Sequence, residues 1–84
     1  MTPEPELHNR LKALRQARGM TQAELAEAVG VSRKTVNTVE NRVFIPSTLL
    51  ALKLARALGV PVEEVFALEP FAPLPEVAAK GDPS

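Results

Sequence analysis

The sequence predicts an all-α fold: a compact domain of five short helices over residues 1–68, followed by an extended, proline-rich tail over residues 69–84. Apolar residues recur every three or four positions, glycines and hydroxyl-bearing residues stand where helices would end and begin, and no alternating strand pattern is present. Four prolines between residues 70 and 84 disfavour a helix in the tail. Because a chain of 84 residues buries one modest core, a single domain is expected.

The first two helices are predicted over residues 7 to about 18 and about 22 to 29. In the first, three leucines share one face, and Gly19 follows as a residue that tolerates the left-handed conformation common after helices. The second begins after Thr21, which forms a capping-box pattern with Glu24. In this pattern the threonine oxygen accepts a hydrogen bond from the third helical amide, while the carboxylate accepts one from the amide of the cap.

A short turn joins the second helix to a third, expected over about residues 33–41. Gly30 can take a positive φ at this turn, and Ser32 is a favourable N-cap. Ala26 is small enough for two steeply crossing helices to approach closely, and Val36 anchors the third helix on its inner side. This spacing predicts a helix-turn-helix.

The last two helices follow a loop that ends at Pro46, which disfavours helical geometry in the residue before it. Ser47 caps a fourth helix that runs to about Leu58. Pro61 precedes a short amphipathic segment, residues 62–66, whose early glutamates favour a helix start.

The outer face of the third helix is polar and begins with two cations. Arg33, Lys34, Asn37, Thr38 and Asn41 fall within an arc of roughly 140° at 100° per residue. A cation near a helix N-terminus is unfavourable because the peptide dipoles make that end partly positive. One interpretation is an ordinary solvated face, and the other is a face that meets phosphates and base edges, because an α-helix fits the DNA major groove.

The distribution of charged residues along the chain restricts the classes of function that are plausible. The net charge is zero, but residues 1–60 carry nine Lys/Arg against five Glu, whereas residues 61–84 carry one Lys against five Asp/Glu. Such asymmetry favours nucleic-acid contact by the basic part.

No cysteine is present, which excludes disulfides and thiolate metal sites. Without an apolar run of membrane-spanning length or a secretory signal, a cytoplasmic protein is expected.

An enzyme is not expected from this sequence. His8 is the only histidine and is expected at the surface, no pair of carboxylates has a convincing pocket context, and no glycine-rich phosphate loop is present. No metal, cofactor or small-molecule ligand is therefore predicted.

Residues 11–66 resemble the Cro and phage-repressor (XRE) type of helix-turn-helix transcriptional regulators. The first three helices of that family are similar to LKALRQARGMTQAELAEAVGVSRKTVNTVEN, and the fourth and fifth helices of its small bacterial members are similar to PSTLLALKLARALGVPVEEVF. The resemblance implies a lambda-repressor-like, five-helix domain that regulates transcription. It implies a homodimer that reads a palindromic operator with its third helix in the major groove, most readily as a repressor.

The resemblance also implies roles for individual residues. Reading of bases is implied for Arg33, Lys34, Asn37 and Thr38. Contacts with DNA phosphates are implied for Thr21, Gln22, Thr35, Asn41 and Arg42. The sequence departs from the family at the last of these, where many relatives have glycine. A structural ion pair between the first and third helices is implied for Arg15 and Glu40.

The fourth helix is apolar nearly all round, which is typical of a helix that is buried on two sides or packs on a partner. A homodimer surface is predicted at Leu49, Leu52, Val65, Phe66, Leu68 and Phe71. The alternative is intramolecular, with Phe44 and Phe66 closing the core and the tail folding back. An alternative function is an antitoxin or other partner-binding protein, in which the domain autoregulates and the tail binds a protein partner.

Overall fold

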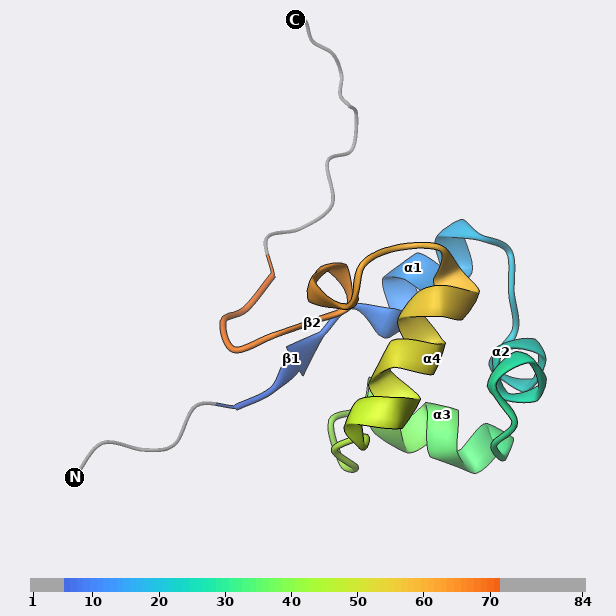
Figure 1. Cartoon of the computed structure of the whole chain (residues 1–84). Helices are drawn as coiled ribbons and strands as arrows, with labels where there is room; N and C mark the ends of the chain where they lie inside the picture. The colour runs from blue at the N-terminus through green and yellow to red at the C-terminus, as the bar shows by residue number, and fades with distance from the viewer. Residues whose placement is uncertain (1–5, 72–84) are drawn as a thin grey trace, which may run out of the picture.

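The computed structural model describes residues 6–71, and the predicted tail from residue 72 onward lies outside this range. The described residues form four α-helices, one 3₁₀ turn and a two-stranded antiparallel sheet (Figure 1). In chain order these are β1 (His8–Asn9), α1 (Leu11–Ala17), α2 (Gln22–Val29), α3 (Arg33–Glu40), α4 (Thr48–Leu58), η1 (Val62–Glu64) and β2 (Phe66–Ala67). No helix within residues 6–71 is long and apolar enough to cross a membrane.

The starts of α2, α3 and α4 are set by side-chain caps, as predicted. The Glu24 amide donates to Thr21 Oγ1 over 3.0 Å, and the Thr21 amide donates to Glu24 Oε1 over 2.8 Å, which completes the capping box of α2. Ser32 caps α3 and Ser47 caps α4, each accepting from the amide three residues later. Gly30 ends α2 with a φ of 78°, a conformation that a Cβ would strain.

The prediction of a first helix from residue 7 and of no strand is wrong. Residues His8–Asn9 pair with Phe66–Ala67 in antiparallel register, and the helix begins only at Leu11. The Asn9 side chain promotes this late start, because its Oδ1 accepts from the Leu11 amide over 3.0 Å. Two-residue strands are too short to show a period of two, so no sequence pattern announced them.

The predicted fifth helix is one 3₁₀ turn. Glu64 and Val65 donate to the carbonyls of Pro61 and Val62, three residues back, and no further helical turn follows within the described chain. Instead, the carbonyl of Val65 accepts from the Arg10 amide over 3.0 Å, and β2 begins at the next residue. Pairing with β1 therefore replaces the rest of the expected helix.

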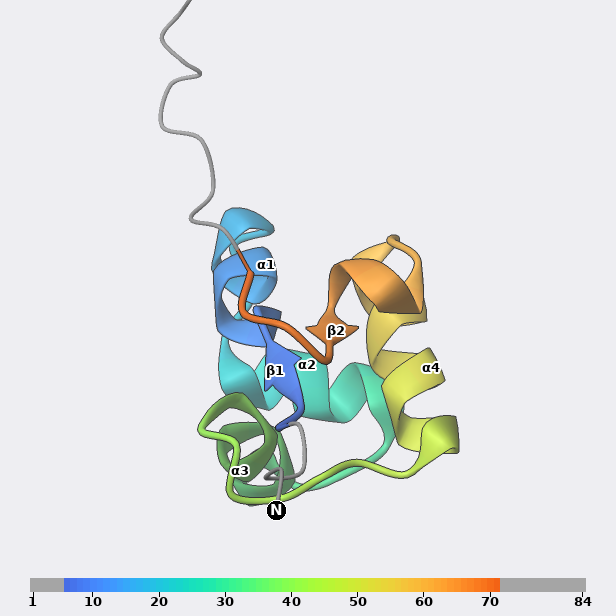
Figure 2. The same ribbon diagram turned by 90° about the vertical axis from the view of Figure 1, so that its left-hand side faces the viewer.

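The core lies between the helices and is apolar except for Arg15 and the side chain of Glu40. It is lined by Leu11, Leu25, Ala26, Val29, Val36, Val39, Leu50, Leu54, Ala55, Leu58 and Val65. Figure 2 views the molecule from the side of the β1–β2 sheet, with α3 and η1 at opposite ends. Val65 is fully buried in this core, so its predicted place on a dimer surface is wrong. Phe44 is largely exposed, so it does not close the core.

Candidate nucleic-acid interface

The outer face of α3 presents two cations and an amide to solvent. Arg33, Lys34 and Asn37 are exposed, whereas Val36 and Val39 on the opposite face are buried. Within residues 6–71, neither cation forms an ion pair. The helix dipole disfavours a cation at a helix start, so the helix itself does not hold these two charged groups in place. Both groups can therefore interact with an acceptor outside the protein.

The two threonines of α3 are half-buried, and their hydroxyls have partners within the protein. Thr38 Oγ1 donates to the carbonyl of Thr35 over 2.9 Å, and Thr35 Oγ1 lies 3.0 Å from Ser32 Oγ. The hydroxyl proton of Thr38 is therefore used inside the helix. Its oxygen can still accept and its methyl group can contact an apolar base edge.

At the start of α2, the hydrogen-bond donors that remain available to an external acceptor are mainly backbone amides and not side chains. Thr21 is exposed, but the Gln22 side chain turns inward, where its Nε2 donates to Glu40 Oε1 over 3.0 Å. The capping box satisfies the amides of Thr21 and Glu24. Of the orphan donors at this helix end, the amides of Gln22 and Ala23 remain for another acceptor, and the dipole there favours an anion.

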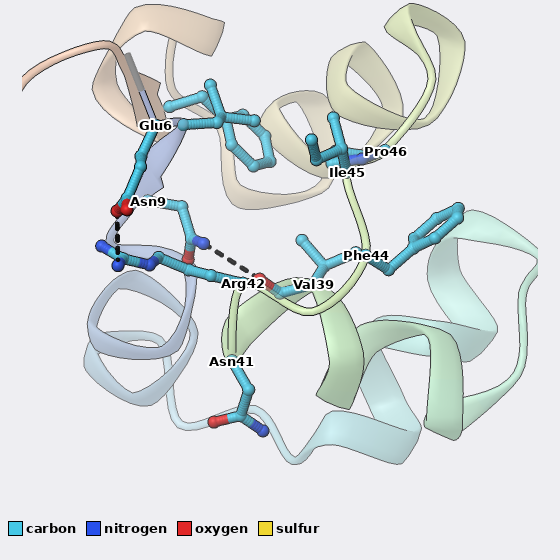
Figure 3. A pocket seen from close by; sticks show the side chains of 10 residues that line it. Glu6, Asn9, Val39, Asn41, Arg42, Phe44, Ile45 and Pro46 are labelled. Atoms are coloured by element: carbon cyan, nitrogen blue, oxygen red, sulfur yellow. Dashed lines mark hydrogen bonds and ion pairs between the residues drawn. The ribbon is translucent and has the colours of Figure 1, made fainter. Parts of the chain in front are cut away.

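The end of α3 leads into a strained turn. Asn41 is exposed and its Nδ2 donates to the Asn37 carbonyl over 2.9 Å. Arg42 has a φ of 61° and is the only described residue other than glycine with a positive φ. Its guanidinium lies 2.8 Å from His8 Nδ1 and 2.9 Å from Glu6 Oε1, on the rim of a hollow (Figure 3). His8 is thus half-buried beside Arg42 rather than simply at the surface.

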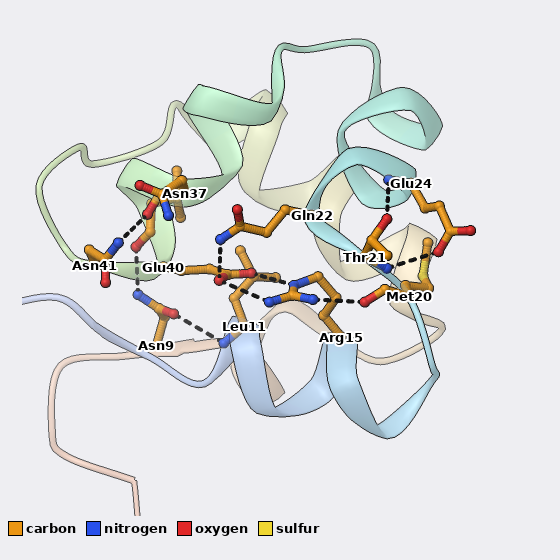
Figure 4. A network of polar contacts seen from close by, with 11 residues as sticks. Asn9, Leu11, Arg15, Met20, Thr21, Gln22, Glu24, Asn37, Glu40 and Asn41 are labelled. Atoms are coloured by element: carbon orange, nitrogen blue, oxygen red, sulfur yellow. Dashed lines mark hydrogen bonds and ion pairs between the residues drawn. The ribbon is translucent and has the colours of Figure 1, made fainter.

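The ion pair between Arg15 and Glu40 is present and buried. Arg15 Nε donates to Glu40 Oε2 over 2.6 Å, and the two side chains are only 8% and 2% exposed. Two further hydrogen bonds complete the network (Figure 4). Arg15 Nη1 donates to the backbone carbonyl of Met20, and the side-chain amide of Gln22 donates to Glu40 Oε1. Because Glu40 is the last residue of α3 and Arg15 lies in α1, the pair fixes α3 relative to α1.

A second link to α3 was missed from the sequence. Asn9 Nδ2 donates to the carbonyl of Val39 over 3.0 Å, while its Oδ1 accepts from Leu11 (Figure 4). One side chain therefore caps the end of α3 and the start of α1. An asparagine two residues before a helix signals the second contact, but nothing in the sequence signals a carbonyl 30 residues away.

The predicted dimer residues occupy different environments. Leu49, Leu52 and Leu68 are exposed, whereas Phe66 and Phe71 are half-buried. Phe71 lies beneath the Arg10 guanidinium, whose carbon is 4.8 Å from the ring centroid. The same guanidinium pairs with Glu64 in η1, so Arg10, at the start of α1, contacts the chain both before and after β2.

Comparison with known proteins agrees with this geometry. Residues 11–65, more than half of the chain, match the family model described as helix-turn-helix. The chain belongs to the Cro/C1-type helix-turn-helix family. This is a family of DNA-binding transcriptional regulators. The chain is 44% identical over 63 residues to the HTH-type transcriptional regulator YgzD of Bacillus subtilis, a match that covers 75% of this chain and 96% of the relative.

Solved structures of other regulators share the fold. The restriction-modification controller protein C.AhdI from Aeromonas hydrophila is 40% identical and superimposes with a TM-score of 0.64, covering 66% of this chain and 83% of that one. The clp gene regulator ClgR from Corynebacterium glutamicum is 33% identical with a TM-score of 0.62, covering 64% and 57%.

Proposed function

We propose that this family member is a sequence-specific repressor in the cytoplasm that binds a palindromic operator as a homodimer, with α3 in the major groove. The observation that carries the proposal is the outer face of α3. Arg33, Lys34 and Asn37 project there without ion-pair partners in the described chain, next to a buried framework that holds the helix still.

The residue types on that face suit base reading. An arginine or lysine can donate to the two acceptors that guanine shows in the major groove, and an asparagine can pair with adenine. We assign base contacts to Arg33, Lys34, Asn37 and Thr38, with Thr38 acting through its methyl group and acceptor oxygen. The unfavourable placement of two cations at a helix start is then offset in the complex by acceptors on the DNA.

Phosphate contacts flank the reading face. At the start of α2, the amides of Gln22 and Ala23 point to a ready anion site, with Thr21 beside it. Thr35, Asn41 and Arg42 supply the remaining polar groups around α3. Arg42 exchanges its ion pair with Glu6 for one with a phosphate when it binds DNA. The gain in DNA affinity from Arg42 is therefore the difference between the two ion pairs.

Dimerisation follows from the small size of one reading surface. A single α3 reaches few bases, and a chain of zero net charge has little non-specific attraction to DNA. Two copies joined on half-sites about 34 Å apart multiply their contacts. The relatives described above are named as a transcriptional regulator, a controller protein and a gene regulator, so the antitoxin alternative gains no support from them.

The test is selection of bound DNA from a random pool, followed by affinity measurements on the selected operator. Arg33→Ala is expected to relax preference at one operator position by roughly 1 to 3 kcal/mol, while binding to random DNA changes little. Arg42→Ala is expected to weaken all DNA alike and to flatten the salt dependence by about one phosphate per copy. Lys12→Ala, an exposed cation on α1, is the matched control.

Equal losses on operator and random DNA for Arg33→Ala and Arg42→Ala would contradict the assignment of base reading to α3. A selected sequence without two-fold symmetry would contradict the palindromic operator. Loss of binding in Lys12→Ala as large as in Arg33→Ala would show that the effect is one of general charge.

A further inference from the structure

The imidazole of His8 contacts the guanidinium of Arg42, and DNA binding as proposed above makes no use of this contact. Arg42 Nη1 lies 2.8 Å from His8 Nδ1, although the two residues are 34 positions apart in the chain. A guanidinium carries donors and no acceptor, so the ring nitrogen is the acceptor of this hydrogen bond. The contact therefore requires the neutral imidazole, with its proton on Nε2.

The second acceptor of the same guanidinium is a carboxylate. Arg42 Nη2 donates to Glu6 Oε1 over 2.9 Å (Figure 3). The guanidinium thus bridges one neutral acceptor and one charged acceptor at the N-terminal end of the described chain. The side chains of Arg42 and Glu6 are 45% and 67% exposed, so an anion from outside can reach the bridging group.

The ionisable groups around His8 come from few elements of the described chain. The turn after α3 supplies Arg42, and the segment before β1 supplies Glu6. On the other side, β2 (Phe66–Ala67) pairs with β1 and supplies no group that titrates. Arg10, two positions after His8, is already paired with a carboxylate of η1. The charge state of the imidazole therefore acts mainly on the bridge.

A proton on His8 would break the bridge. A protonated imidazole has no acceptor, and it places a second cation beside the guanidinium. It also competes with Arg42 for the carboxylate of Glu6. Arg42 then loses its two protein acceptors, and its guanidinium becomes available to a DNA phosphate.

We propose that His8 controls the phosphate contact of Arg42, so that operator binding strengthens as the pH falls and the imidazole gains a proton. The proposal rests on the phosphate contact assigned to Arg42 above and adds a means of regulation to it. Imidazole is the side chain whose charge ordinarily changes within the physiological range of pH, and His8 is the only histidine of the chain.

The direction of the effect follows from the exchange of partners. When Arg42 leaves His8 for a phosphate, a cation moves away from the imidazole and an anion comes near, and both changes favour its charged form. Coupling between two binding events is reciprocal, so a proton on His8 favours the DNA complex by the same factor. Affinity is therefore highest where the imidazole of the free protein is already charged, and falls as the pH rises until the imidazole of the complex is neutral.

The first test is fluorescence anisotropy on the selected operator, at constant ionic strength, from about pH 5.5 to about pH 8.5. The wild type is expected to bind about three to ten times more tightly at the acidic end. His8→Gln keeps an acceptor for Arg42 but gains no proton. It should match the wild type at the alkaline end and lose the increase at the acidic end. The α-amino group also titrates in this range, but it is present in both proteins.

The second test leaves β1 unchanged. Arg42→Ala removes the group that His8 releases, so this variant should bind more weakly at every pH and show a flat profile. Lys12→Ala, the exposed cation on α1, should keep the pH profile of the wild type. Circular dichroism of each variant checks that the fold is retained.

A third measurement requires no DNA. In the free protein at alkaline pH, the ¹⁵N chemical shifts of the His8 ring should show an unprotonated, hydrogen-bonded Nδ1. The Nδ1 shift should move in Arg42→Ala and stay in place in Lys12→Ala. A protonated Nδ1 would mean that the bridge does not form.

The outcomes separate this proposal from DNA binding itself. Operator binding by His8→Gln with the pH profile of the wild type would overturn the role of His8 and leave the proposed function intact. A pH profile that persists in Arg42→Ala would make His8 itself the contact with DNA, which contradicts the release of Arg42. If no protein binds a selected sequence at any pH, the proposed function fails, and the regulation fails with it.

Discussion

At the scale of single residues, the buried ion pair and the strained turn after α3 define how the reading helix is held. The Arg15 guanidinium donates to three acceptor atoms, the two carboxylate oxygens of Glu40 and the carbonyl oxygen of Met20, and has almost no contact with solvent. Burial removes the hydration of both charges, so each depends on the other for its stabilisation. Arg42 differs from Arg15. Its backbone has a strained, positive φ, whereas its side chain is exposed to solvent.

Removal of the Glu40 charge is expected to be strongly destabilising. Glu40→Gln keeps the volume but leaves the Arg15 guanidinium buried without a counter-charge, and should lower the free energy of unfolding by about 3 to 5 kcal/mol. Glu64→Gln breaks an exposed pair with Arg10 and should cost less than about 1 kcal/mol. Urea denaturation measures both. Equal costs for the two variants would mean that burial does not set the strength of the inner pair.

Two substitutions of Arg42 distinguish the effect of its backbone strain on stability from the effect of its side-chain contacts. Arg42→Gly and Arg42→Ala both lose the contact with Glu6, but only glycine takes a φ of 61° without strain, so the glycine variant should be more stable by about 1 kcal/mol. The neighbouring pair Val43→Gly and Val43→Ala should show the reverse order. Thermal unfolding of the four variants measures this, and an alanine variant as stable as the glycine variant would contradict the strain.

At the scale of elements, the smallest ones organise the site. The two residues of β1 connect the C-terminal end of α3 to β2, through the Asn9 side chain on one side and the strand pairing on the other. Asn9 bonds to the last turn of α3 and to the first turn of α1, and Arg10 holds Glu64 and Phe71. The recognition helix is therefore braced at its far end by a strand that no sequence pattern revealed.

Asn9→Asp tests this brace. The carboxylate can still accept from Leu11, but it no longer donates to the Val39 carbonyl. Its negative charge is unfavourable beside the C-terminal end of α3 and favourable at the start of α1, so the lost donor and the two facing oxygens at Val39 decide the sign. The expected loss in the free energy of unfolding is about 1 to 3 kcal/mol, and the ratio of operator to random DNA affinity should fall as α3 loses its fixed position. Chemical denaturation and operator titration measure the two effects.

Asn41→Asp is the matched control for stability, because the same change is made at the same helix end but at an exposed side chain. It should cost less than about 1 kcal/mol, in line with an exposed contact near a helix end. If both aspartate variants unfold alike and Asn9→Asp keeps its preference for the operator, then the bond to Val39 does not position the helix.

At the scale of the whole molecule, charge is unequal along the chain, and the two cations at the start of α3 lie far from the carboxylates of η1. The basic residues of the first sixty positions include the start of α3, whereas η1 carries Glu63 and Glu64 at the opposite end of the molecule (Figure 2). A zero net charge is therefore compatible with DNA binding, because a surface that approaches DNA responds mainly to charges within about one Debye length, roughly 8 Å at physiological salt.

Neutralisation of charges at the two ends should therefore have unequal effects. Glu63→Gln is expected to change operator affinity by less than about twofold at 0.15 M salt, whereas Lys34→Gln should weaken it and lower the salt slope by about one per copy. Fluorescence anisotropy over a range of salt concentrations measures both. A large gain in affinity for Glu63→Gln would indicate that η1 lies near the DNA in the complex.

The sequence by itself determined α2, α3, α4 and the caps between them, because those signals are local: a threonine and a glutamate three residues apart, a serine before a helix, a glycine after one. It also predicted the pairing of Arg15 with Glu40, through the family resemblance. Only the tertiary structure decided the inward turn of Gln22, the burial of Val65, the pairing of β1 with β2 and the exposure of Phe44. Each of these depends on contacts between segments far apart in the chain, whose free energy outweighs the weak local preference of the residues concerned.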